Sequence, residues 1–248
     1  MKPFKHFVLT RFNSGIYNPA GTFSKSNLGI SVDEWMEQRI KLFFTFTLPS
    51  MMAQCNQNFI WLILIDKKTP QKHWHILSEI KYPNINFVYK KWPFEQFLQP
   101  VPFNIITTRI DNDDALHKDT INDIQNCYKE KNLQHNEFFI DMPHGFALDT
   151  VNGRLFPMMH PCSPFVTFAE DFQECKTVLA WEHSRLPAEI HKEYIAGKTY
   201  WLRVVHSQNL RNSMDDNRIH HDKPIGLGVL SNFGIDVNQF TGHVNLPR

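Results

Sequence analysis

The sequence has no run of apolar residues long enough to cross a membrane. Its longest such run, Phe59–Ile65, has seven residues, whereas a transmembrane helix needs about 20. Residues 1–12 also contain no apolar stretch of signal-peptide length. We therefore expect a protein without a transmembrane segment.

The four cysteines form no Cys-X-X-Cys pair, and the chain has almost no net charge. The first absence argues against a zinc knuckle or a thioredoxin-type redox site, so we interpret Cys55, Cys127, Cys162 and Cys175 as reduced thiols of a cytoplasmic protein. The 26 Lys and Arg residues against 25 Asp and Glu leave a charge of +1. That balance gives no sign of a nucleic-acid or anionic-membrane partner.

The chain contains enough apolar and aromatic residues to form a large hydrophobic core. Hydrophobic residues make up 42% of its 248 residues, and a chain of this length can bury a sizeable core without disulfides. Its 21 Phe residues favour an aromatic core or a groove that stacks flat ligands. No repeat or linker divides the chain, so we predict one domain over residues 1–248.

The first half alternates between buried strands and amphipathic helices. Continuous apolar runs predict strands over 7–12, 59–65, 85–89 and 103–110. Helical spacing predicts helices from Asp33 to about Pro49, over 70–80 and over 118–131, with Ser31 and Glu34 as a capping box for the first. This order predicts an α/β fold: a Rossmann-like, mostly parallel central sheet with helices on both faces.

The second half has a different pattern of short strands and loops. Strand-like segments are found at 138–141, 145–148, 154–158, 165–168, 176–181 and 201–205. Asn152-Gly153 is a favourable hairpin turn between two of them.

An acidic turn follows the strand predicted over 103–110. Asp111, Asp113 and Asp114 lie within four residues, and carboxylates this close repel by about 1 kcal/mol per pair near a surface. Mg²⁺ or Mn²⁺ removes that repulsion and prefers oxygen ligands. Ligands of open α/β sheets bind outside the carboxyl ends of the strands, where this turn is expected. The alternative is a solvated turn whose aspartates cap the next helix.

Several strings around this turn are familiar. The chain resembles the bacterial rhamnosyltransferase family, which is GT-A-like and uses nucleotide-sugar donors. The resemblance runs from residue 7 to about residue 235 and rests on Phe7–Asn13, Arg39 with Leu42-Phe43, Thr47–Ser50, Gln54, Asn58-Phe59, Asp66, Thr108–Ala115, Pro143–Gly145, Ser163–Phe165 with Glu170, Thr177-Val178 with His183, and Trp201–Asn209.

The resemblance implies a metal-dependent glycosyltransferase with a GT-A-like fold, Mn²⁺ or Mg²⁺ as cofactor and a saccharide or glycoconjugate acceptor. Residues 1–131 would form the nucleotide-sugar-binding half and residues 132–248 the acceptor half. Metal candidates are Asp111, Asp113, Asp114, His206 and His183, and donor-binding candidates are Arg11, Asp66, Arg109 and Asp111. A bound metal would stabilise the leaving diphosphate.

An inverting transferase also needs a base that deprotonates the acceptor hydroxyl. Glu170 matches the family position and is our first candidate, with the adjacent Asp171 as the second. Two alternative functions stay open at this point. One is a nucleotide- or sugar-binding protein without turnover, and the other is a metal-dependent phosphohydrolase or nucleotidyltransferase that uses the same acidic turn.

Overall fold

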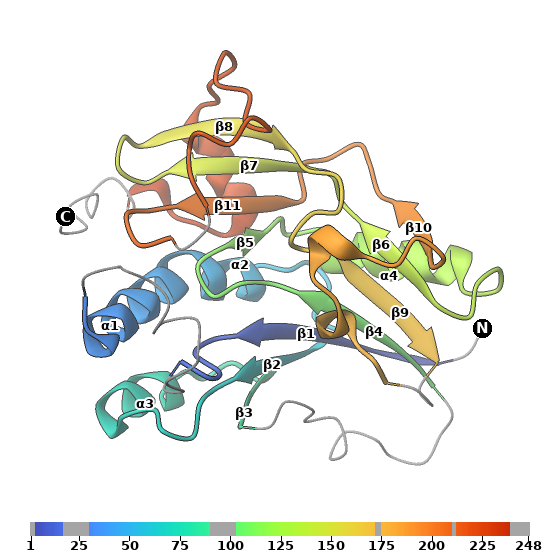
Figure 1. Ribbon diagram of the computed structural model, residues 1–248, viewed down its shortest axis with the longest axis horizontal. Helices are drawn as coiled ribbons and strands as arrows, with labels where there is room; N and C mark the ends of the chain where they lie inside the picture. Colours follow the sequence, from blue (N-terminus) through green and yellow to red (C-terminus); the bar gives the residue numbers. More distant parts are fainter. Residues whose placement is uncertain (1–2, 17–29, 90–102, 172–174, 210–211, 239–248) are drawn as a thin grey trace.

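The computed structural model describes residues 3–16, 30–89, 103–171, 175–209 and 212–238, which form two sheets (Figure 1). The larger has seven strands in the order β10-β6-β9-β4-β1-β2-β3. Their bounds are β1 Phe4–Arg11, β2 Ile60–Leu64, β3 Ile85–Val88, β4 Asn104–Arg109, β6 Phe138–Asp141, β9 Thr167–Asp171 and β10 His191–Tyr194. All neighbours pair in parallel except β9, which is antiparallel to β4 and β6. The expected mostly parallel α/β sheet is confirmed.

The smaller sheet comes from the second half of the chain, with one short strand from the first. Its order is β5-β11-β7-β8, with β5 Ala115–Leu116, β7 His144–Asp149, β8 Arg154–Met159 and β11 Trp201–Val205. In Figure 1 it lies above the larger sheet. Its apolar residues share one core cluster with the larger sheet and the helices.

In the described residues the α-helices pack on one face of the larger sheet, and not on both faces as the sequence predicted. A helical run begins with α1 (Val32–Leu42), passes through a π-helical turn (Phe43–Thr47) and ends in α2 (Leu48–Met52). The expected capping box of Ser31 and Glu34 is present. α3 (Gln71–Ser78) and α4 (Thr120–Lys131) contribute to the same core. In the described residues, the other face is covered by the segment around the 3₁₀ turns Val178–Ala180 and His183–Arg185.

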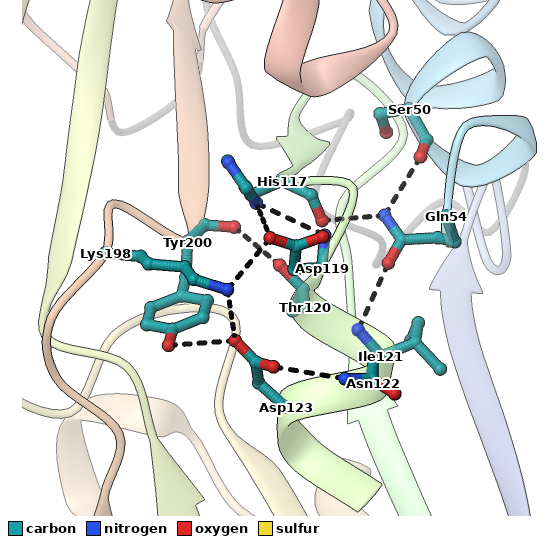
Figure 2. Close-up of polar contacts among 10 residues, drawn as sticks. All are labelled: Ser50, Gln54, His117, Asp119, Thr120, Ile121, Asn122, Asp123, Lys198 and Tyr200. Carbon is teal, nitrogen blue, oxygen red and sulfur yellow. Dashed lines mark hydrogen bonds and ion pairs between the residues drawn. The ribbon is translucent and has the colours of Figure 1, made fainter. Parts of the chain in front are cut away.

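Polar contacts fix the start of α4 against α2 and against the chain entering β11 (Figure 2). The Gln54 amide donates to the carbonyls of Ser50 (3.0 Å) and His117 (2.9 Å) and accepts from the Ile121 N–H (3.1 Å). Lys198 pairs with Asp119 and Asp123 on the other side. Ser50 and Gln54, which were part of the family resemblance, therefore hold the framework together.

Four parts of the secondary structure differ from the expectation. Residues 176–181 are not a strand: the Glu170 carboxylate binds the N–H groups of Lys176 and Thr177 (2.8 Å each), so neither is available for a ladder. The strand expected over 165–168 begins two residues later, and β5 and β10 were not predicted.

All four cysteines are free thiols, and no helix in the described ranges combines the length and apolarity of a membrane span.

Gly145 in β7 gives room to the largest buried side chain of the smaller sheet. A Cβ at Gly145 would overlap the indole of Trp201, which is fully buried, stacks on Phe165 and donates to the Met142 carbonyl (2.6 Å). We expect Gly145→Ala to lower the free energy of unfolding by about 3 kcal/mol, because overpacking displaces a fixed ring. Urea denaturation tests this. Gly228→Ala, which meets only open space, is the control and should change stability by less than about 0.5 kcal/mol.

His6 in β1 is a buried histidine without room for a second proton. Its Nδ1 accepts from Gln125 (3.4 Å), and Nε2 bonds to the Thr108 hydroxyl (2.8 Å). Burial lowers the pKa of His6 to about 3. The unfolded chain takes up this proton below about pH 6.5 and the native chain does not, so His6 makes the native state less stable as the pH falls.

We therefore expect acid to destabilise wild type more than His6→Gln. Between pH 6.5 and 4.5 the difference should reach about 2.3 kcal/mol, because the slope rises from half of about 1.36 kcal/mol per pH unit at pH 6.5 to nearly that full value at lower pH. Urea denaturation at both pH values measures it. Equal losses in the two proteins would show that His6 does not remain neutral in the native state.

Candidate functional site

Three parallel strands place the expected site residues at one edge of the larger sheet. Arg11 pairs with Leu64, and Leu9 pairs with Arg109, so the carboxyl ends of β1, β2 and β4 lie together. Arg11, Asp66 and the turn Asp111–Asp114 therefore share this edge, as expected from the sequence. Asp66 accepts from the N–H groups of Gly15 (3.1 Å) and Lys68 (2.9 Å), so it also organises the loops after β1 and β2.

Asp113 is the centre of the site. Its carboxylate is buried and pairs with the Arg39 guanidinium of α1. Its Oδ2 also lies 3.0 Å from Nε2 of His206, at the end of β11, and 3.4 Å from the Asn209 amide. Burial alone would raise the pKa of Asp113, but the Arg39 charge and the His206 hydrogen bond outweigh it and hold this pKa below its ordinary value.

Arg39 was part of the family resemblance but was not among the candidate site residues expected from the sequence. It is buried, its guanidinium stacks over Trp35 (5.1 Å to the ring centroid) and it donates to Asn112 (3.2 Å) as well as to Asp113. A signal was present: an arginine within the apolar stripe of Trp35, Met36 and Ile40 faces the core and needs a buried partner.

The other two aspartates of the turn have different environments. Asp114 is buried, and its Oδ1 accepts the N–H of Val204 in β11 (2.8 Å), which ties the turn to the smaller sheet. Burial, and next the charges of Asp113 and Asp111, raise the pKa of Asp114 well above its ordinary value. Asp111 is 41% exposed, with Arg109 3.8 Å away. It is therefore the aspartate of this turn open to a ligand.

Several buried polar atoms lack a hydrogen-bond partner in the described residues, and three of them belong to residues around this turn. Arg39 Nε, Arg109 Nε and Gln208 Oε1 are buried without a hydrogen-bond partner. Such groups are rare in native structures and mark places where a ligand or water completes the hydrogen bonding. Two of the three are guanidinium donors, so the edge fits an anionic ligand.

The expected divalent ion fits two of the five candidate ligands. Asp113 Oδ2 and His206 Nε2 are 3.0 Å apart, close to the separation of neighbouring ligands about 2.1 Å from one ion. Neither Asp111 nor Asp114 completes a three-ligand group with them in the described residues. Two contacts oppose an ion between these atoms. Arg39 already neutralises Asp113. The His206 Nδ1 accepts from the Gln208 N–H (3.2 Å), which places the proton of a neutral ring on Nε2, the nitrogen that would bind the ion.

His183 lies apart from this pair but near the exposed part of the turn. Its Nδ1 donates to the Cys162 carbonyl (3.0 Å), and its ring packs edge-on against His160 (5.5 Å between centroids). Burial is the largest cause that lowers its pKa, and the charges of Arg109 and Asp111 also act on it. No hydrogen-bond partner of Nε2 is found in the described residues. The neutral ring therefore keeps a basic nitrogen at Nε2.

The structure places Glu170 and Asp171, the candidate bases expected from the sequence, away from the acidic turn. β9 runs antiparallel to β4, and its last residues pair with the first residues of β4: Glu170 with Ile105, and Asp171 with Asn104. Both carboxylates therefore lie at the edge opposite the acidic turn. Glu170 is also buried and binds two backbone N–H groups, which gives it a structural role.

A polar cavity of about 400 Å³ lies where the carboxyl end of β7 meets the amino end of β8 in the smaller sheet. Asp149, which ends β7 and pairs with Val205 just before His206, is part of its wall. Asp216, which is held by Arg203 (2.9 Å), is another. The remaining lining residues are Arg154, Phe156, Met214, Asp215, Asn217 and His221. Carboxylates and an amide beside an aromatic ring suit a hydroxyl-rich ligand.

Comparison with known proteins gives one family and a set of distant structures. A family model described as "Putative rhamnosyl transferase" matches residues 22–217. No curated protein matches. Crystal structures of S. aureus TarS residues 1–349, alone and in complex with UDP, are 12% and 11% identical, with TM-scores of 0.40 and 0.41; each match covers 82% of this chain and 60% of that chain. A further TarS structure is 14% identical at a TM-score of 0.39 and is covered to 37%.

Proposed function

Because the chain belongs to the rhamnosyl transferase family, a glycosyltransferase family, we propose that it transfers a sugar from a nucleoside-diphosphate donor to a hydroxyl of a saccharide or glycoconjugate. Rhamnose is the sugar that the family description suggests. The observation that carries the proposal is the site edge itself. Spare guanidinium donors of Arg39 and Arg109 lie beside an acidic turn at the carboxyl ends of parallel strands, where ligands of such sheets bind.

The donor diphosphate needs positive charge as its bond to the sugar breaks. Arg109, whose Nε has no hydrogen-bond partner and lies 3.8 Å from the exposed Asp111, is placed to bind it. Asp113 and His206 would hold a Mn²⁺ or Mg²⁺ ion, which acts as a Lewis acid toward the diphosphate when bound. Such ions take one or two protein ligands and complete their shell with water and phosphate. Arg39 competes for the same carboxylate, so removing its charge should favour the ion.

Transfer with inversion forms two bonds and breaks two. The acceptor oxygen bonds to the anomeric carbon, the bond between that carbon and the diphosphate breaks, and the hydroxyl proton goes to a base. His183 fits the base: its Nδ1–H is fixed on the Cys162 carbonyl, which leaves Nε2 as the proton acceptor. This proposal replaces Glu170.

The acceptor is proposed to enter through the polar cavity of the smaller sheet. The cavity begins at Asp149, beside the end of β11 that carries His206. A saccharide bound there would approach the donor from the side of the second sheet. This placement would give the two halves of the chain the donor and acceptor roles expected from the sequence.

The direct test is release of nucleoside diphosphate from a panel of nucleotide sugars, including dTDP- and UDP-linked rhamnose, with and without Mn²⁺ and saccharide acceptors. We expect release by at least one donor and acceleration by an acceptor. Thermal shift with nucleoside diphosphate and Mn²⁺ together should exceed the shift with either alone. Binding without turnover would favour a sugar- or nucleotide-binding protein, and hydrolysis of simple phosphate esters would favour a phosphohydrolase.

A further inference from the structure

A second cluster of potential ligands lies far from the acidic turn. His135 follows α4, whereas His191 and Glu193 are on β10. One ligand atom from each of the three lies within 4.8 Å of the other two, and these residues form the one such group in the described part of the chain. His191 pairs with Phe138, the first residue of β6. The cluster is therefore at the amino end of β6, and the proposed active site is at the carboxyl ends of the parallel strands.

Local structure brings these three side chains together. His191 and Glu193 are two residues apart on one strand, so they face the same side, and His191 Nε2 lies 2.8 Å from Glu193 Oε1. The ring of His135 stacks on that of His191, with centroids 3.9 Å apart and an interplanar angle of 14°. A neutral imidazole keeps one lone pair for a metal.

We propose that His135, His191 and Glu193 form a binding site for Zn²⁺ or a similar divalent transition-metal ion. Two imidazole nitrogens and one carboxylate are a donor set that suits such ions, while Mg²⁺ and Ca²⁺ prefer oxygen ligands throughout. The cluster is at the surface, with His191 exposed and the other two half-buried, so an ion has access and water can complete its coordination.

The bound ion would stabilise β10 at the edge of the larger sheet. In the described residues β10 pairs with β6 alone and forms the edge of the larger sheet. An ion shared by His135 and β10 would connect that edge to the chain that leaves α4, and it would limit pairing with other molecules. Lys131 already lies 3.2 Å from the Glu193 carboxylate and competes with the ion for it.

The test is Zn²⁺ binding by calorimetry and thermal shift, without chelators and without nucleotide. We expect saturating Zn²⁺ to raise the Tm of wild type by about 5–10 °C, as for a ligand at about 100 times its Kd. Mg²⁺ at the same concentration should give no comparable shift. His135→Gln and His191→Gln should each weaken Zn²⁺ binding at least tenfold, since each removes one of three ligands. Lys131→Met should strengthen it.

Two controls separate this site from others. His75→Gln changes a histidine that is 71% exposed and lies outside the cluster, and it should leave Zn²⁺ binding unchanged. His206→Gln tests the acidic turn. Zn²⁺ binding that persists in His135→Gln and His191→Gln but is lost in His206→Gln would overturn the proposal. Absence of Zn²⁺ binding to wild type would overturn it as well, and neither result bears on the proposed glycosyl transfer.

Discussion

Asp113→Asn is expected to lower the free energy of unfolding by about 3–5 kcal/mol, the range for breaking a buried ion pair by removing one partner. The variant keeps the shape of the side chain but leaves the Arg39 guanidinium buried without a counter-charge. Water cannot solvate the Arg39 guanidinium in place of the lost carboxylate, because this side chain is only 8% exposed. Urea denaturation at neutral pH, in the absence of divalent ions, measures the loss.

The same turn supplies a matched control. Asp111→Asn makes the same chemical change two residues earlier, at a carboxylate that is 41% exposed. It should change stability by less than about 0.5 kcal/mol. If the two variants are equally stable, the Arg39 and Asp113 pair does not hold the folded state together.

A double variant separates the pair from the individual side chains. Arg39→Met alone should also be destabilising, because Asp113 then keeps a buried charge with only His206 and Asn209 as partners. Combining Arg39→Met with Asp113→Asn removes both charges. We expect the double variant to be more stable than the sum of the single losses predicts, with an interaction energy of about 1–3 kcal/mol.

From the sequence alone, the opposite result was expected at Asp113. Three adjacent carboxylates repel, so removing one should have relieved the turn in the absence of metal. Repulsion is present, since the charges of Asp113 and Asp111 help to raise the pKa of Asp114. The sequence could not show that α1 brings Arg39 to Asp113, because this contact joins residues 74 positions apart. Local charge counting is therefore unreliable at a buried turn.

The features that were predictable are those set by neighbours in the sequence. The continuous apolar runs of β2 and β4 imply strands buried on both faces, and the structure places each between two others. The Ser31 and Glu34 capping box depends on residues three apart and was correct. The position of the acidic turn was also correct, because a turn after a parallel strand has to lie at the carboxyl edge.

The features that were missed depend on strand direction and long-range pairing. Glu170 was expected at the site because it matches the family position and follows a strand-like segment in the second half of the chain. Only the antiparallel insertion of β9 between β4 and β6 sends it to the other edge. β10 was not predicted because its sequence, His-Lys-Glu-Tyr, is polar and because the strand pairs on one side only. Exposed edge strands often have such sequences, since charge discourages further pairing.

His183→Asn is expected to reduce kcat by about 10²–10⁴-fold, the contribution of a general base. Asparagine can keep the donor that His183 directs to the Cys162 carbonyl, but it has no basic nitrogen in place of Nε2. Because the substitution leaves Arg109 and the acidic turn intact, the KM for the nucleotide sugar should change little. Steady-state kinetics with the donor and acceptor identified by the panel give both values.

The pH profile separates a base from a positioning role. Only neutral His183 accepts a proton, so activity should fall as the pH drops through its pKa, which burial lowers from the ordinary value of 6.5. The acid limb of kcat should therefore lie below pH 6.5 in wild type and should be absent from the residual activity of His183→Asn. If the variant retains the acid limb, that limb arises from the donor phosphates or from another residue. Asp171→Asn, at the opposite edge of the sheet, should keep both the rate and the limb; a large loss of kcat there, with His183→Asn fully active, would return the role of base to the end of β9.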